Sequence, residues 1–546
     1  MRILVLTAIT VLTLGPTVRA ADLLPPDQPV ESVIDHYIDA LMKDDGVAPA
    51  PQIDDLNLIR RLSLDIAGRI PSTSEVQDYA ASDSETKRAE LVDRLLASPD
   101  FVWHQRNELD YMLLPNRPGD GEFRKYLQWA LEQDRSWDDM FRDMLTGDGS
   151  DENLKAATQF VRTRIGSLDD LTNDTARLFF GVNVSCAQCH DHPLVEDWKQ
   201  DHYFGMQMFF KRTYQTKKGL LGDRFYGDVK FKTTAGVEKQ AAFMFLSGSV
   251  IDDKTKDLSD DEKKKHDEHI KKLQKDDKAG DPPKADFSPR KQLVELALKD
   301  GDNLFFARNI ANRVWARMLG RGLVDPTDQI HSGNDASHPD LLDWLARDLI
   351  AHGYDLKRLM RGIALSQAYS RTSEWTSTDE PPDGSYFAVA IPKVMTPRQY
   401  GLSLLIAARS PEKLHIPPMD QSEEYRKWRE DFENRSNGWA NRVEIPHDSN
   451  FQVSVDEALM FSNDGGLQND LLSENHDRLL GYMKKLESTD EQLQAAFWAI
   501  CSRQPAAEEL AALTDFIEKR PEEERLPAMK QAVWALLTGP EIRFNY

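Results

Sequence analysis

The stretch DLNLIRRLSLDIAGRIPSTSEV, residues 55–76, contains two helix signals and the break between them. Apolar residues recur as far as Ile66 at the spacing of one helical face, which predicts an amphipathic helix. Gly68 marks the end of that helix, and the Pro71–Thr73 segment opens the next turn or helix. The stretch therefore predicts a chain of short helices joined by tight turns.

The rest of the chain repeats this helical pattern around one strand signal. Between residues 227 and 249, apolar and polar residues alternate on either side of Gly236, which predicts a β-hairpin. We predict a mainly α fold with two helical domains, 21–251 and 290–546, and a small β-hairpin element near residues 227–249. Helical periodicity is present in residues 22–42, 87–101, 135–149, 173–190, 290–299, 303–319, 338–353, 356–369, 396–410 and 528–546. The helix in 173–190 runs toward the two closely spaced cysteines, and Asn173 or Asp174 is its expected N-cap.

A charged linker, residues 252–289, separates the two predicted domains. It contains almost no large apolar residues, which predicts a mobile segment or a solvated helix that ends near Ala279–Gly280. His266 and His269 lie in this linker, and a solvated charged face explains them better than a metal site does.

Residues 1–20 have the composition of a secretory signal peptide. A basic start at Arg2 precedes a short apolar run over residues 3–14 and small residues up to Ala20. Because this run is too short to span a bilayer, we expect cleavage after Ala20. The mature protein is then periplasmic or extracellular, with no further membrane span; the alternative is an uncleaved N-terminal anchor.

The charge of the chain excludes one class of partner. Its 546 residues carry a formal net charge of −23, and loss of Arg2 and Arg19 with the signal makes the mature protein still more negative. Such a surface repels phosphate backbones, so no nucleic-acid partner is expected, whereas a cationic partner is favoured. Hydrophobic residues at 40% and charged residues at 29% are typical of a soluble globular protein.

Cysteine is rare in this chain. Only Cys186, Cys189 and Cys501 occur, so the fold must depend on its hydrophobic core and not on disulfides. Cys501 ends an apolar helical segment, which predicts a buried free thiol. The other two cysteines lie in VSCAQCHDHP, residues 184–193, where a histidine directly follows the second cysteine.

This spacing, Cys186-x-x-Cys189-His190, is that of covalent attachment of one haem c. The two thiols bond the haem vinyl groups, and His190 is the proximal iron ligand. Attachment takes place outside the bacterial inner membrane, where the predicted signal would deliver the chain. The alternatives are a disulfide between the two cysteines, or a zinc site that adds His190, His192 or His202. The haem interpretation needs the fewest coincidences.

The surroundings of the motif resemble a known family. FFGVNVSCAQCHDHPLVEDWKQDHYFGMQMFF, residues 179–210, is similar to the cytochrome-like domain of unknown function common in secreted planctomycete proteins, and RRLSLDIAGRIPS and LVDRLLASPDF resemble its upstream blocks. ARNIANRVWARMLGRGLVDPTDQI, SHPDLLDWLARDLIAHGYDLKRLMRGIALSQAYSR and VWALLTGPEIRFNY resemble the second domain that usually follows. The resemblance covers nearly the whole mature chain and implies a cytochrome-like protein without an established reaction.

Other ligand candidates lie close to the motif. His192 matches the family pattern, but in a helix it would face away from His190. We therefore expect it to make a hydrogen bond at the haem edge or to form a cap before Pro193; the alternative is an ordinary structural histidine. His202, Met206 and Met208 depart from the family pattern, and the methionines, which lie among phenylalanines, are expected to pack in the core.

The block HSGNDASHPDLLDWLA suggests that the second domain contributes to the same site. Ser337 is a good helix N-cap and Pro339 suits the first turn, which places His338 at a helix start. His338 is therefore a candidate distal ligand or haem-pocket residue. The alternative is a histidine that packs locally at a helix terminus.

No GxSxG, HExxH, GxxxxGK[ST] or GxGxxG motif accompanies these features. The sequence therefore predicts an exported c-type haem protein in electron transfer or redox chemistry, with a redox partner protein. The alternative is a non-redox secreted binding module or polysaccharide-acting enzyme, in which the CxxCH region is a structural disulfide or zinc site.

Overall fold

The computed structural model describes residues 23–115, 121–147, 149, 151–192, 195–299, 304–414, 422–440, 461 and 463–546. The predicted signal peptide lies outside the described residues. As predicted, the fold is mainly α-helical, with small two-stranded antiparallel sheets. Among the described helices, none combines the length and apolarity that a membrane crossing requires.

The N-terminal half is a series of short helices followed by three hairpins. The helices are α1 (Val30–Asp45), α2 (Asp55–Leu62), the π-helix η1 (Ser63–Ala67), α3 (Thr73–Ala81), α4 (Lys87–Leu96), α5 (Pro99–Leu113), α6 (Glu122–Glu132), α7 (Trp137–Thr146), α8 (Glu152–Ala157), α9 (Gln159–Arg162), α10 (Leu168–Phe180), the 3₁₀ helix η2 (Ser185–Gln188) and α11 (Gln200–Lys211). The hairpins pair β1 (Thr213–Gln215) with β2 (Leu221–Asp223), β3 (Lys230–Lys232) with β4 (Glu238–Gln240), and β5 (Phe243–Met244) with β6 (Val250–Ile251). The predicted hairpin is confirmed, and Gly236 lies in the β3–β4 turn.

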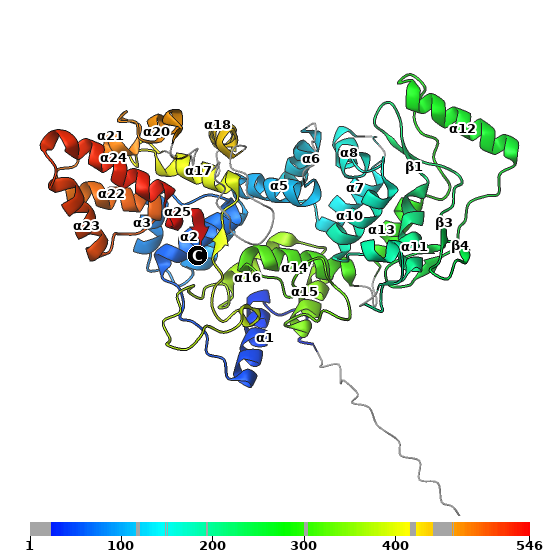
Figure 1. The fold of residues 1–546 in the computed structure, drawn as a ribbon, viewed down its shortest axis with the longest axis horizontal. Coiled ribbons are helices and arrows are strands. Elements are labelled where there is room, and N and C mark those ends of the chain that lie inside the picture. Colours follow the sequence, from blue (N-terminus) through cyan, green and yellow to red (C-terminus); the bar gives the residue numbers. More distant parts are fainter. Residues whose placement is uncertain are drawn as a thin grey trace, which may run out of the picture.

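The C-terminal half adds further helices and one strand pair. The helices are α12 (Asp260–Lys275), α13 (Pro289–Ala297), α14 (Phe305–Leu319), α15 (Pro339–Ala351), α16 (Leu356–Leu365), η3 (Gly384–Tyr386), α17 (Pro397–Ala407), α18 (Ser422–Ala440), α20 (Gly465–Leu471), α21 (Leu479–Met483), α22 (Thr489–Cys501), α23 (Ala507–Glu518), α24 (Glu522–Thr538) and α25 (Pro540–Arg543). β7 (Lys393–Val394) pairs with β8 (Phe544–Asn545). In Figure 1, α21–α24 form one end of an elongated molecule, α14–α16 lie near its middle, and α12 projects at the other end.

The stretch over residues 55–76 lies between two hydrophobic cores. Leu62 and Ile66 belong to the larger core, which contains side chains from both predicted domains. Leu64 and Ile70 belong to the smaller core, which is otherwise formed by α17 and the residues around and after it. The stretch therefore contributes to both cores at once.

Polar side chains of the same stretch hold distant parts of the chain together. Arg61 donates hydrogen bonds of 2.5 and 2.8 Å to the carbonyls of Tyr369 and Arg371. Asp65 accepts hydrogen bonds from the Tyr369 hydroxyl at 2.8 Å and from Lys393 Nζ at 2.5 Å. Each of these contacts joins residues that are more than 300 positions apart. A buried charge is stable only with such partners, so these bonds fix how the two halves meet.

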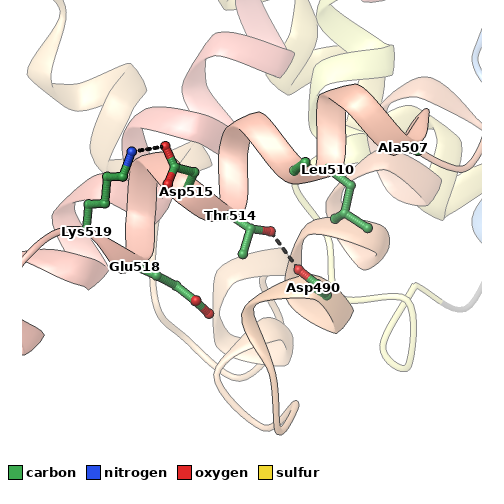
Figure 2. Close-up of a pocket in the computed structure, with 8 residues that line it drawn as sticks. Asp490, Ala507, Leu510, Thr514, Asp515, Glu518 and Lys519 are labelled. Carbon is green, nitrogen blue, oxygen red and sulfur yellow. Dashed lines mark hydrogen bonds and ion pairs between the residues drawn. The ribbon is translucent and has the colours of Figure 1, made fainter.

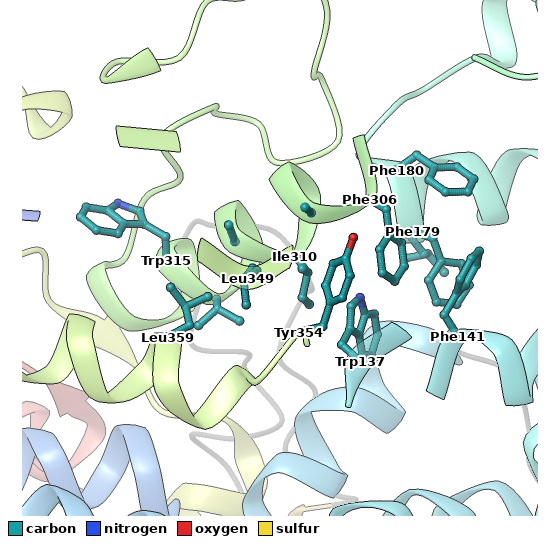
Figure 3. Packing of buried hydrophobic residues seen from close by; sticks show 14 of the residues in the cluster. Trp137, Phe141, Phe179, Phe180, Phe306, Ile310, Trp315, Leu349, Tyr354 and Leu359 are labelled. Atoms are coloured by element: carbon teal, nitrogen blue, oxygen red, sulfur yellow. The ribbon is translucent and has the colours of Figure 1, made fainter. Parts of the chain in front are cut away.

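Aromatic side chains from both predicted domains interlock in the larger core (Figure 3). The ring of Phe306 on α14 lies 4.7 Å from that of Phe141 on α7 and stacks on Trp137 at 6.2 Å. Phe141 in turn lies 4.7 Å from Phe179 on α10. Such pairs contribute about 0.5–1.5 kcal/mol each beyond the burial of their area. The domain boundary at residues 252–289 stays a prediction, and the core is continuous across it.

The predicted start of the helix before the motif is wrong. We expected Asn173 or Asp174 as its cap, but α10 begins earlier, at Leu168. Ser167 is the cap, because its Oγ accepts a hydrogen bond of 3.1 Å from the backbone N of Asp170. Acidic residues in the first turn favour this earlier start through the helix dipole.

The charged segment 252–289 contains a helix, α12, that ends at Lys275, short of the predicted end. Most of its side chains are exposed, as His269 is. His266 is buried, however, and stacks on Phe225 with a ring-centroid distance of 4.1 Å. Its Nε2 accepts a hydrogen bond of 3.2 Å from the backbone N of Phe225. The expected solvated position is therefore wrong for His266, because the few nonpolar surfaces of α12 face the protein.

Candidate functional site

The CxxCH motif follows the C-terminal end of α10, and residues of the C-terminal half fix that end. Gly181 ends the helix with φ +68, and a Cβ there would lie 2.6 Å from Ile330 Cδ1. Only glycine fits such a left-handed position at such a close approach. Asn309 Nδ2 donates a hydrogen bond of 2.7 Å to the carbonyl of Leu178. This carbonyl lies in the last turn of α10, where the helix itself supplies no N–H donor. Ile330 N donates one of 2.9 Å to the Gly181 carbonyl.

The two cysteines are presented by the 3₁₀ helix η2. Asn183 Oδ1 accepts hydrogen bonds from the backbone N and the Oγ of Ser185, at 3.2 and 2.7 Å, and so opens the turn. Ala187 is fully buried in the larger core. Cys186 and Cys189, on either side of it, are exposed and carry free thiols. The buried alanine anchors the turn, and both sulfurs face the outside.

A hydrogen-bond network around Asp169 holds η2 against α10 and α11. Asp169 Oδ2 accepts a hydrogen bond of 3.1 Å from Gln188 Nε2. Its Oδ1 accepts from the Tyr203 hydroxyl at 2.7 Å and from Gln207 Nε2 at 2.5 Å. Burial and the hydrogen bond to Asp169 raise the pKa of Tyr203, so its hydroxyl stays a donor. These residues were not predicted from the sequence, where their only signal is the spacing of Tyr203 and Gln207 on one helix face.

His190 has the protonation pattern of a metal ligand. Its side chain is exposed, and its Nδ1 lies 2.7 Å from the backbone carbonyl oxygen of Asp191. Because a carbonyl oxygen can only accept, the Nδ1 atom of the neutral ring carries the proton, and Nε2 then keeps its lone pair. Histidines that bind metals through Nε2 are commonly oriented by such an Nδ1–H bond to a carbonyl.

The two other histidines around the motif have the opposite tautomer. His192 Nδ1 accepts a hydrogen bond of 3.0 Å from Val195 N, and His202 Nδ1 accepts one of 3.2 Å from Lys199 N. When neutral, each of these rings carries its proton on Nε2. The bond from Val195 agrees with the expected turn-capping role of His192. The chain is not helical at residues 190–192, so His192 is not turned away from His190 by helix geometry as predicted.

The methionines after the motif lie in the core, as predicted. Met206 and Met208 are buried, at 0% and 2% exposure, and Met208 Sδ accepts a hydrogen bond of 3.2 Å from Val229 N. Among the described residues, no group of three or more His, Cys, Asp and Glu side chains is arranged to hold a metal ion.

His338 lies at the N-terminus of α15, where it is itself the N-cap residue and is buried. The predicted cap at Ser337 is wrong, because the Oγ of Ser337 lies 3.1 Å from His338 Nδ1 and not on the helix backbone. The ring centroid of His338 lies 5.8 Å from that of Phe387, and burial lowers the pKa of His338 to about 4. Its contacts in the described chain do not include residues 186–192, and its place in the site stays a prediction.

The C-terminal half meets the motif through a different loop, residues 329–334. Ser332 donates two hydrogen bonds to the carboxylate of Asp197, from its backbone N at 2.7 Å and from its Oγ at 2.8 Å. His331, beside it, has a pKa that is lowered by burial, and its electrostatic neighbours are Asp197 and His192. His331 was not predicted as a site residue, because no local sequence pattern links this loop to a motif that lies far before it in the chain.

A separate shallow groove of about 580 Å³ lies between α22 and α23 (Figure 2). Thr514 Oγ1 donates a hydrogen bond of 2.6 Å to Asp490 Oδ1, and Lys519 Nζ pairs with Asp515 Oδ2 at 2.6 Å. These polar side chains satisfy one another, and none of the predicted site residues lines the groove. The CxxCH region is therefore the better candidate site.

Comparisons with known families place the motif inside a recognised domain. Residues 33–215 match the family model PSCyt2, described as "Protein of unknown function (DUF1549)". Residues 289–517 match PSD1, described as "Protein of unknown function (DUF1553)". The chain carries these two matches in this order. No curated protein and no solved structure matches it.

Proposed function

We propose that the chain is an exported c-type haem protein in electron transfer or redox chemistry outside the cytoplasm. One observation carries the proposal: the 2.7 Å bond between His190 Nδ1 and the Asp191 carbonyl, beside two exposed free thiols. That bond leaves the Nε2 lone pair available, as a proximal ligand requires. The short name of the first family model, PSCyt2, supports the same proposal.

Each residue of the motif has a separate role in this proposal. Cys186 and Cys189 form the two covalent attachments, and their exposure leaves both sulfurs accessible. His190 supplies the proximal nitrogen, and the carbonyl of Asp191 fixes its ring orientation. A bound haem supplies one-electron redox chemistry. The net charge of −23 favours a redox partner with a cationic surface.

Covalent haem is tested by expression of the full chain with its signal and the haem-maturation machinery. A denaturing gel stained for haem peroxidase activity is expected to show a band at the size of the protein. The Cys186→Ser/Cys189→Ser double variant is expected to lose the band, because both attachment sulfurs are gone. Cys501→Ser is the matched control and keeps it, since this thiol is buried and burial raises its pKa to about 12.

A colourless wild-type product under these conditions would contradict the proposal. Mass spectrometry then separates the alternatives. A bridge between Cys186 and Cys189 identifies a structural disulfide, and stoichiometric zinc identifies a zinc site. Either result points to the non-redox binding module or polysaccharide-acting enzyme.

A further inference from the structure

We propose that His331, from the C-terminal half, completes the haem site by donating an Nε2–H hydrogen bond to a carboxylate, which in the haem-loaded protein is a haem propionate. This inference rests on the proposed function of the CxxCH motif. It differs from the sequence prediction, which placed His338 there.

The loop that carries His331 is fastened to the motif on both sides of the histidine. Ile330 N, immediately before it, donates to the Gly181 carbonyl at 2.9 Å. Ser332, immediately after it, donates to both oxygens of Asp197, at 2.7 and 2.8 Å. Gly181 precedes the motif and Asp197 follows it in the chain. The position of the imidazole is therefore set by the two flanks of the haem-attachment segment.

The hydrogen bonds of His331 favour a donor role over iron ligation. Its Nδ1 accepts a hydrogen bond of 3.1 Å from the backbone N of Gly333. The neutral ring therefore carries its proton on Nε2, the opposite of His190. The imidazole is half-buried, and its Nε2–H has no hydrogen-bond acceptor within the part of the chain that the structure describes. A ligand that supplies the acceptor is therefore stabilised by a hydrogen bond from this half-buried donor.

A carboxylate fits this place by its hydrogen-bond chemistry. A carboxylate oxygen accepts charge-assisted hydrogen bonds, which are shorter and stronger than those to a neutral acceptor, so it is a good partner for the His331 Nε2–H. The carboxylate of Asp197 already accepts the two bonds from Ser332. A haem bound at the cysteines brings its own propionates to this region, whereas a free carboxylate would have to bind from solution.

The test compares the midpoint potential of the haem-loaded His331→Ala variant with that of the wild type. We expect a lower potential, because a propionate without its donor places more negative charge near the iron and stabilises the ferric state. His331→Gln keeps an N–H donor and is expected to restore the potential. The exposed His269, on α12, gives the matched control, and His269→Ala is expected to leave the potential unchanged.

Ser332→Ala tests the fastening separately, with no change of charge. It is expected to lower the potential in the same direction as His331→Ala but by less, because the loop loses the Oγ bond of 2.8 Å to Asp197 and keeps the backbone bond. The double variant is expected to show no larger shift than His331→Ala alone, since both changes act through one imidazole. Additive shifts would contradict the assignment.

Three results would overturn the inference. If the midpoint potential of His331→Ala equals that of the wild type, His331 is not a hydrogen-bond donor to the haem. A change from a low-spin to a high-spin spectrum in that variant would make His331 an iron ligand. Acetate binding to the haem-loaded wild type that is lost in His331→Ala would assign the donor to a free carboxylate. A colourless wild-type protein would instead overturn the proposed function, and this inference with it.

Discussion

At the scale of single residues, Glu75 shows how one ion pair limits the acid stability of the fold. Its carboxylate accepts hydrogen bonds of 2.8 and 2.9 Å from the fully buried Arg69 and one of 2.7 Å from Ser72 N. Burial alone would raise the pKa of Glu75, but the charge and hydrogen bonds of Arg69 lower it to about 2. The folded state therefore gains stability above the ordinary glutamate pKa and loses it as the pH falls toward 2.

We predict that Glu75→Gln lowers the free energy of unfolding at neutral pH by about 3 kcal/mol. This is the free energy that corresponds to lowering the pKa of Glu75 from 4.5 to about 2. The variant is also expected to lose less stability than the wild type as the pH falls from 4.5 to 2. Urea unfolding at a series of pH values measures both effects. Glu262→Gln, in the exposed capping box of α12, is the control and is expected to have a small effect. Parallel pH profiles for Glu75→Gln and the wild type would contradict the prediction.

Some features of single residues are specified by the local sequence, and others depend on the fold. The buried free thiol at Cys501 is confirmed, at 1% exposure, because burial follows from an apolar helix. The spacing of Cys186, Cys189 and His190 identified the motif. The tautomer of His190, however, depends on where one backbone carbonyl lies, and no sequence pattern specifies that.

At the scale of elements, the sequence predicted the start of a helix where the capping side chain lies next to that start in the chain. Ser72 caps α3 with a full capping box, as the segment after Gly68 suggested. The π-helical turn η1 was not predicted: its Leu64 packs in the smaller core and its Ile66 and Ala67 in the larger one, and no local period specifies packing against two cores at once. The cap of α10 was placed too late in the chain, because Leu168 and Leu171 already continue the apolar spacing before Asn173, and Ser167 is a good N-cap residue.

The C-terminal end of α10 gives a prediction at this scale. Gly181→Ala is expected to destabilise the protein in two ways: a left-handed residue with a side chain costs about 1 kcal/mol, and contact with Ile330 at 2.6 Å adds overpacking of about 1–3 kcal/mol. Gly46 ends α1 at φ +69, and no atom lies within 4 Å of the position that an added Cβ would take, so Gly46→Ala has only the first cost. Thermal unfolding of both variants measures the difference. Equal losses of stability in the two variants would show that the Ile330 side chain moves aside without an energetic cost.

At the scale of the whole molecule, sequence patterns predict two domains, whereas one hydrophobic core contains side chains from both of them. Composition marked the charged segment 252–289 as a boundary, and the family matches lie on either side of it. The larger core nevertheless contains residues from Val30 to Leu246 and from Phe287 to Ala388. Contacts between distant segments are not encoded in any local period, so the shared core could not be predicted from sequence.

This shared core predicts how the protein responds to a protease. The first cleavage is expected within residues 252–289, where α12 buries few side chains and its flanks have little regular structure. The nicked protein is expected to elute as one particle in native size-exclusion chromatography, because the aromatic contacts of Phe306 with Phe141 and Trp137 still join the two fragments. In urea the fragments should separate. Separate elution under native conditions would show that the linker, and not the core, holds the halves together, and a first cut within residues 184–192 would place the weakest segment at the motif itself.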